Sequence, residues 1–167
     1  DDAEIASLIS EAVAALDAAV DFGRYDNDGD DGVPNSGDDA GVVDFIALVH
    51  PETGSECGGT GPNIWSHSWQ YAVWAGTTLP TGDASASGGM IQIDDYTIQP
   101  ALSCDGGLIE VGVFCHEFGH ALGLPDLYDY DSGAAASQGL GYWCLMANGN
   151  WNTPTDPAHM SAWAKAE

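Results

Sequence analysis

The sequence has almost no positive charge. It contains 2 lysines and arginines against 26 aspartates and glutamates, so the formal net charge is −24. A surface of this sign repels nucleic acid and anionic membranes, and neither is expected as a partner. Two explanations of the acidity stay open, because composition does not separate them: an adaptation for solubility, for example at high salt where self-repulsion is screened, and calcium binding.

Long apolar runs and targeting signals are also missing. No run of about 18 apolar residues occurs, so membrane insertion is not expected. The first residues, Asp1 to Glu4, lack the basic and apolar regions of a signal peptide, so a secreted protein with this sequence would be in its processed form. With 167 residues, of which 44% are hydrophobic, the chain is predicted to form a single domain with one core.

Cysteines number 4, and no Cys-x-x-Cys spacing suggests a structural zinc site. Cys57, Cys104, Cys115 and Cys144 fit two disulfides in an oxidising compartment, which favours a secreted, extracellular protein. Three pairings are possible, and four reduced, buried thiols are the alternative.

Residues 115 to 126, Cys-His-Glu-Phe-Gly-His-Ala-Leu-Gly-Leu-Pro-Asp, carry the most informative motif. In a helix, His116 and His120 share one face about 5–6 Å apart, so both imidazoles can reach a single Zn²⁺ with Glu117 beside its open position. Gly123 and Pro125 are predicted to end this helix. The opposite face is apolar: Val111, Phe114, Phe118, Ala121 and Leu122.

The third zinc ligand is predicted to be Asp126. It follows His116 by ten residues, where the longer His-Glu-x-x-His-x-x-Gly-x-x-His pattern places its third ligand. His159 is the alternative, because it is the only histidine after His120. A glutamate ligand from a later helix is excluded within this sequence, since no glutamate occurs between Ala121 and Ala166.

This ligand set predicts a zinc endopeptidase. Glu117 would take a proton from a zinc-bound water as that water attacks the scissile carbonyl, and would pass the proton to the leaving amine. Proteins or peptides are the expected substrates. Two other classes stay open: a non-catalytic calcium-dependent adhesion module, which has no need of Glu117, and a zinc hydrolase acting on a non-peptide bond. Nothing in the sequence predicts an oligomeric state.

A second metal site is predicted near the amino terminus. Asp26, Asp28 and Asp30 alternate with glycines nearby, as a loop that converges hard oxygen ligands on Ca²⁺ requires. The loop is not an EF-hand, and Asp38, Asp39 or Asp44 would close the coordination shell, with Asp44 preferred. The alternative is a solvated acidic turn. Bound calcium would stabilise the protein.

The zinc motif with its glycine and aspartate resembles the immune inhibitor A family of secreted metalloendopeptidases. The likeness extends to residues 25–30, 64–67, 96–100 and 157–163. It implies an α+β, metzincin-like zinc peptidase core: a twisted mixed sheet, a backing helix, an active-site helix, a Met-turn at Met146 and a C-terminal helix. The whole chain would be one catalytic domain, trimmed at both ends, with a sheet-bearing upper part at 1–107 and the active-site helix, Met-turn and last helix at 108–167.

Individual elements follow from periodicity and from this resemblance. Helices are expected at 3–20 and 160–167, a central strand at 42–49, and further strands at 71–75 and 90–98, the last ending at Pro100. The resemblance makes 90–98 the sheet edge that binds substrate. It also favours a Cys115–Cys144 disulfide, which would tie the active-site helix to the Met-turn and leave Cys57 with Cys104. His67 is expected to be structural. Tyr128, Tyr130 and Tyr142 are the candidates for donating a hydrogen bond to the oxyanion that develops on the scissile carbonyl.

Overall fold

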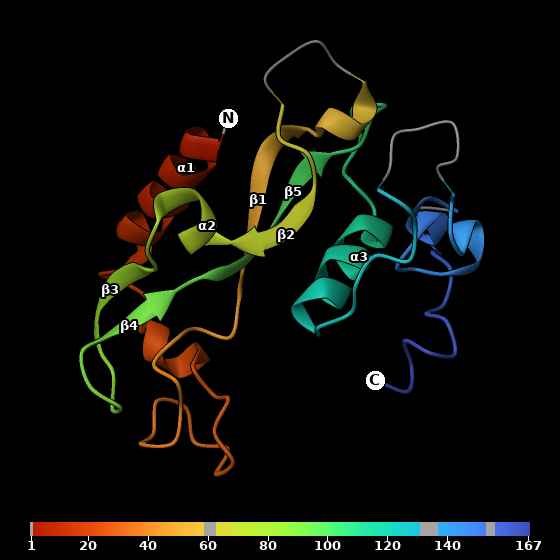
Figure 1. The fold of residues 1–167 in the computed structure, drawn as a ribbon. Coiled ribbons are helices and arrows are strands. Elements are labelled where there is room, and N and C mark those ends of the chain that lie inside the picture. The colour runs from red at the N-terminus through yellow and green to blue at the C-terminus, as the bar shows by residue number, and fades with distance from the viewer. Residues whose placement is uncertain (1, 59–62, 131–136, 153–155) are drawn as a thin grey trace. The chain divides into compact units, whose positions relative to one another are not determined.

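The chain forms an α+β structure (Figure 1). The computed structural model describes residues 2–58, 63–130, 137–152 and 156–167. The helices are α1 (Asp2–Leu16), α2 (Tyr71–Ala75) and α3 (Val111–Ala121). The strands are β1 (Ile46–Thr53), β2 (His67–Gln70), β3 (Leu79–Ala84), β4 (Met90–Ile93) and β5 (Asp95–Leu102). Within the described residues, no helix is both long and apolar enough to cross a membrane.

The chain divides into two compact units. One comprises residues 1–48 and 69–96, and the other comprises residues 49–68 and 97–167. The chain passes between the units within β1, β2 and β5.

Strand β5 is the middle strand of a three-stranded sheet with the order β1-β5-β2 (Figure 1). Its residues Tyr96 and Ile98 are fully buried. The prediction of a central strand at 42–49 is therefore wrong: β1 begins later and lies at an edge, where Pro51 costs no ladder hydrogen bond. The single strand predicted at 90–98 is instead two strands, β4 and β5, which lie in different sheets. Because β5 runs past Pro100 and has a neighbour on each side, it is not the free substrate-binding edge that the resemblance implies.

The first unit combines α1 with a hairpin of β3 and β4. Helix α1 buries Ile9 and Val13 and ends earlier than expected, at Leu16. The strand predicted at 71–75 is instead helix α2. Its start is held by the backbone amide of Ala72, which donates to Asp94 Oδ1 at 2.8 Å, a capping contact from a residue distant in sequence.

The second unit contains α3, where the predicted helix and its end are confirmed: the helix spans Val111–Ala121, and Gly123 follows it with φ of 87°. The predicted apolar face is not the buried one, because Val111, Phe118 and Leu122 are exposed whereas the face of His116 and Glu117 is buried. The predicted C-terminal helix is wrong. Residues 162–166 form hydrogen-bonded turns: Lys165 N bonds to Ser161 O, but Ala166 N bonds to Trp163 O, an i→i−3 bond in place of the i→i−4 bond of an α-helix.

One of the two favoured disulfides is present. Cys57 and Cys104 are bonded, as predicted, whereas Cys115 and Cys144 are free. The side of α3 turned toward residue 145 is the side that carries His116, and Cys115, one residue earlier, lies about 100° away around the helix. Cys144 is fully buried and its sulfur accepts a hydrogen bond from Ser161 N at 3.3 Å.

Candidate metal centre

Three side chains of the second unit converge on one point. His116, His120 and Asp126 each offer one ligand atom, and these atoms lie within 4.8 Å of one another. Oδ1 of Asp126 lies 3.0 Å from Nε2 of His116 and 3.4 Å from Nε2 of His120. The two imidazole rings stand edge to face with their centroids 4.9 Å apart. A single ion at this point would contact all three groups.

Hydrogen bonds outside the cluster orient both imidazoles. Nδ1 of His116 bonds to the carbonyl of Leu145 at 2.7 Å, and Nδ1 of His120 bonds to the carbonyl of Leu124 at the same distance. A carbonyl only accepts, so each Nδ1 carries the proton, and the lone pair of each neutral ring is on the Nε2 that faces Asp126. This is the tautomer that a metal-binding histidine needs.

The turn after α3 brings the carboxylate to the two rings. Gly123 N donates to His120 O at 2.8 Å, and Leu124 N to Gly119 O at 3.0 Å, which reverses the chain within three residues of the helix end. The backbone amide of Leu127 then donates to Met146 O at 2.6 Å. The hydroxyl of Tyr130 donates to Oδ2 of Asp126 and leaves Oδ1 for the cluster.

The cluster fits a divalent cation. Oδ1 of Asp126 is buried and accepts no hydrogen bond, because the two nearest atoms are the unprotonated imidazole nitrogens of the tautomer described above. Three electron-pair donors meeting without a proton repel one another unless a positive charge lies between them. Two imidazoles and one carboxylate are a ligand set that suits zinc and leaves a coordination position open.

Without a metal, the site would attract protons instead. Burial lowers the pKa of His116 and of His120, but the Asp126 carboxylate outweighs it, and both values lie above the usual one. Burial conversely raises the pKa of Asp126, but the hydrogen bond from Tyr130 and those that His116 and His120 would donate once protonated at Nε2 outweigh it and bring that pKa well below its usual range. The cluster therefore favours positive charge at its centre.

Glu117 lies beside the cluster without being part of it. Its side chain is buried, with 4% exposed, and Oε2 has no hydrogen-bond partner. It shares with His116 a cavity of about 470 Å³. Burial raises the pKa of Glu117 to about 7, although His116 and His120 act to lower it. A carboxylate with this pKa is suited to exchange protons near neutral pH.

A turn that carries Met146 packs against helix α3 at Gly119. Met146 is fully buried, and a Cβ added at Gly119 would lie 2.4 Å from its sulfur, so only glycine at this position lets the methionine approach so closely. Ala147 N donates to Cys144 O at 3.1 Å and closes the turn. Because Gly119 immediately precedes His120, this contact helps to fix the position of His120 relative to the turn at Met146.

The other residues considered for the site lie elsewhere. His159 is exposed and outside the cluster, and its carbonyl accepts a hydrogen bond from Leu145 N at 3.1 Å. Nδ1 of His67 bonds to Trp65 O at 2.7 Å, also outside the cluster. Of the three tyrosines, Tyr128 lines the cavity and Tyr142 is 57% exposed.

A second group of carboxylates lies in the first unit. Asp26, Asp28 and Asp39 each offer an oxygen within 4.8 Å of the others. The structure thus brings together two of the predicted calcium ligands with Asp39, whereas Asp30 and Asp44 are exposed and outside the group. Asp44 instead accepts a hydrogen bond from Asn27 N at 3.3 Å.

Sequence reasoning missed several residues that line the 470 Å³ cavity, above all Glu56 and Ser66. Glu56 belongs to no motif, and its neighbour Cys57 was noted only for its disulfide. The disulfide was the one available signal, since the Cys57–Cys104 bond brings the loop at 54–58 to the segment that leads into α3.

An α+β fold in which the two histidines of a His-Glu-x-x-His helix meet a following aspartate, with the glutamate facing a cavity, is typical of a metallopeptidase. A family model described as immune inhibitor A peptidase M6, catalytic domain, matches residues 4–166, and the chain belongs to this family.

Two kinds of curated relatives are similar to it. Immune inhibitor A of Bacillus thuringiensis subsp. alesti is 36% identical over 155 residues, which cover 86% of this chain and 21% of the relative. Pre-pro-metalloprotease PrtV of Vibrio cholerae, found in two strains, is 34% identical over 151 residues, which cover 85% of this chain and 15% of the relative. The chain therefore spans about a fifth or less of the length of these relatives.

Proposed function

We propose that this chain is the catalytic domain of a secreted zinc endopeptidase that cleaves protein substrates. The observation that carries the proposal is the convergence of His116, His120 and Asp126 beside Glu117, a buried residue that lines the same cavity as His116 and whose Oε2 has no hydrogen-bond partner. Membership of the metallopeptidase family supports it. Secretion is supported by the Cys57–Cys104 disulfide, since such bonds persist in oxidising compartments.

In this proposal, Nε2 of both histidines and Oδ1 of Asp126 hold zinc. When bound, zinc supplies a Lewis acid that makes water more acidic and polarises the scissile carbonyl. The protein contributes orientation: the carbonyls of Leu145 and Leu124 hold the two imidazoles, and the hydroxyl of Tyr130 holds the carboxylate.

Glu117 is the general base. Its buried carboxylate accepts the proton of the attacking water and then gives it to the nitrogen of the departing amine, so that the carboxylate is regenerated. A carboxylate with no other hydrogen bond at Oε2 is free to receive that proton. Tyr128, which lines the same cavity, is the tyrosine best placed to donate to the carbonyl oxygen as charge develops on it.

The metzincin-like character of the core is part of the proposal. It is supported by the order of four features along the chain. These are the active-site helix, the glycine that ends it, the aspartate that follows as third ligand, and the turn in which Met146 packs against Gly119.

A structural calcium site is proposed at Asp26, Asp28 and Asp39. Asp26 is fully buried, and its Oδ1 has no hydrogen-bond partner. Burial, followed by the charges of Asp39 and Asp28, raises the pKa of Asp26. A hard cation would relieve this repulsion, and calcium takes oxygen ligands of this kind.

Hydrolysis of casein tests the function. The zinc-loaded protein should cleave casein, a zinc chelator should abolish cleavage, and added zinc should restore it. Glu117→Gln should lower the rate by at least about 100-fold, the low end of the contribution of general-base catalysis, while zinc stays bound. Cleavage that survives both chelation and Glu117→Gln would reject the proposed mechanism.

A further inference from the structure

Glu56 adds a second carboxylate to the cavity of the candidate site. It follows β1 in a short 3₁₀ turn at Ser55–Cys57, and it lines the same 470 Å³ cavity as His116 and Glu117. All of these residues belong to the second unit. Nothing in the zinc chemistry proposed above uses Glu56.

Two neighbours hold this carboxylate in place. Ser66 Oγ donates to Glu56 Oε1 at 2.6 Å, and Ser66 N lies 3.4 Å from Oε2. The carboxylate of Glu56 also folds back over Gly54, where the absence of a Cβ leaves room for it. A side chain that is already held by hydrogen bonds loses little entropy when it binds a ligand, which makes it suited to specific recognition.

No basic side chain lies beside Glu56 to pair with it among the described residues that line the cavity, apart from the His116 already assigned to the metal site. The described lining residues include no lysine or arginine, and the aromatic rings of Trp65, Trp151 and Tyr128 stand around the cavity. Trp65 and Trp151 are 61% and 43% exposed, so their faces are available to a ligand. Carboxylates and indole faces together are groups that attract a cation.

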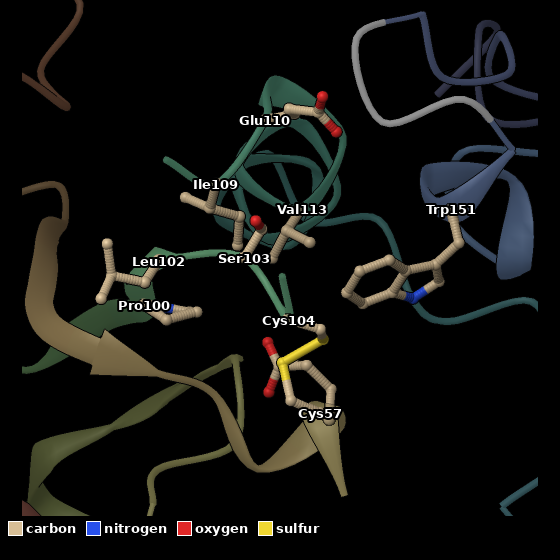
Figure 2. Close-up of a pocket in the computed structure, with 10 residues that line it drawn as sticks. Cys57, Pro100, Leu102, Ser103, Cys104, Ile109, Glu110, Val113 and Trp151 are labelled. Carbon is tan, nitrogen blue, oxygen red and sulfur yellow. A yellow bond between two sulfur atoms is a disulfide. The ribbon is translucent and has the colours of Figure 1, made fainter. Parts of the chain in front are cut away.

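A smaller, apolar cavity of about 40 Å³ adjoins the first, and the two share Glu56, Cys104, Val113 and Trp151. Figure 2 shows Val113 and Trp151 on either side of it, with the Cys57–Cys104 disulfide at its base. Lysine and arginine combine an aliphatic stem with a charged end, and apolar walls beside a carboxylate accommodate both parts.

We propose that Glu56 is a specificity-determining residue that pairs with a lysine or arginine side chain of the substrate close to the scissile bond. This inference rests on the proposed peptidase function. Ser66 acts as a positioning residue that keeps the carboxylate turned toward the substrate.

Matched peptides test the pairing. Internally quenched peptides of one sequence carry lysine or arginine, or their uncharged counterparts norleucine and citrulline, at each position near the cleavage site. The zinc-loaded protein should prefer the basic peptide at one position by about tenfold in kcat/KM, the scale of a partly desolvated charge pair. Glu56→Gln should reduce this preference, measured as the ratio of kcat/KM for the basic peptide to kcat/KM for its uncharged counterpart, to about twofold or less. The preference of the Ser66→Ala protein for the basic peptide should lie between those of the wild type and the Glu56→Gln protein.

The matched control is Glu52→Gln, which removes the same charge from an exposed position of β1 and should keep the preference. Binding gives a second readout: Glu117→Gln protein should bind the lysine peptide more tightly than the norleucine peptide, and adding Glu56→Gln should remove the difference. If the wild type cleaves peptides without a basic preference, or Glu56→Gln retains one, the inference fails while the peptidase function stands. If the wild type cleaves none and the binding difference persists, only the function fails.

Discussion

At the scale of single residues, the site depends on which atoms lack a partner. Oδ1 of Asp126 and Oε2 of Glu117 are both buried and without a hydrogen bond, and each would be costly in a protein that made no use of it. The two oxygens have different surroundings, however. Asp126 faces two imidazoles, whereas Glu117 faces the cavity, which supports the proposal that the first binds the metal and the second transfers the proton.

This difference makes Asp126 the residue whose loss should release the metal. Asp126→Ala should weaken zinc binding by more than about 100-fold, because loss of a ligand costs more than loss of an outer contact. The exposed His159 provides the control, and His159→Ala should bind zinc like the wild type. Zinc content after dialysis against a competing chelator measures both. If His159→Ala lost zinc and Asp126→Ala retained it, His159 would be the third ligand.

At the scale of elements, the loop from Asp26 to Asp39 differs from α3 in how it is held. Helix α3 is stabilised by its own hydrogen bonds, whereas the loop is closed by carboxylates that accept from backbone amides: Asp39 Oδ1 from Gly29 N at 2.7 Å, and Asp28 Oδ1 from Ala40 N at 2.8 Å. These bonds gather negative charge in one place. The loop is therefore the element whose stability should depend most on a bound cation.

Calcium should accordingly raise the melting temperature of the zinc-loaded protein. At about 100 times the Kd, ligand binding contributes about 2.7 kcal/mol, which corresponds to a shift of roughly 5–10 °C for a domain of this size. Asp26→Asn should abolish the shift, yet be at least as stable as the wild type without calcium, since it removes an uncompensated buried charge.

Asp30→Asn is the matched control, because Asp30 is exposed and outside the carboxylate group, and it should retain the calcium shift. Differential scanning calorimetry with calcium or with a calcium-selective chelator gives the comparison. An equal calcium shift in the Asp26→Asn protein would place the ion elsewhere.

At the scale of the whole molecule, the net charge of −24 opposes folding through self-repulsion. This repulsion acts over a distance set by the ionic strength, about 30 Å at 0.01 M salt and about 3 Å at 1 M. It is a property of the charge density of the chain and not of any one site.

The melting temperature should therefore rise as sodium chloride increases from about 0.01 M to 1 M, with calcium removed by chelation. Tetramethylammonium chloride at the same ionic strength should raise it similarly, because screening does not depend on which cation is present. A rise with sodium alone would indicate a specific ion site in place of general screening.

The local features of this protein were predictable from its sequence. The end of α3 at Gly123 and the approach of Asp126 to His116 and His120 involve residues within about ten positions of one another, where helix periodicity and turn chemistry dominate. Strand order was not predictable in this way. The apolar run at 42–49 suggested a central strand, but β5 occupies the centre because pairing depends on partners far along the chain.

The sequence alone determined the family, the two histidines with their glutamate and aspartate, and the acidic charge, because each of these depends on residue identity and short spacing. Only the tertiary structure decided that Asp39 joins Asp26 and Asp28 while Asp30 and Asp44 stay outside, that Cys115 and Cys144 remain free, and that Glu56 lines the cavity of Glu117. These outcomes depend on which distant segments the packed core brings together, and no local pattern in the chain encodes that choice.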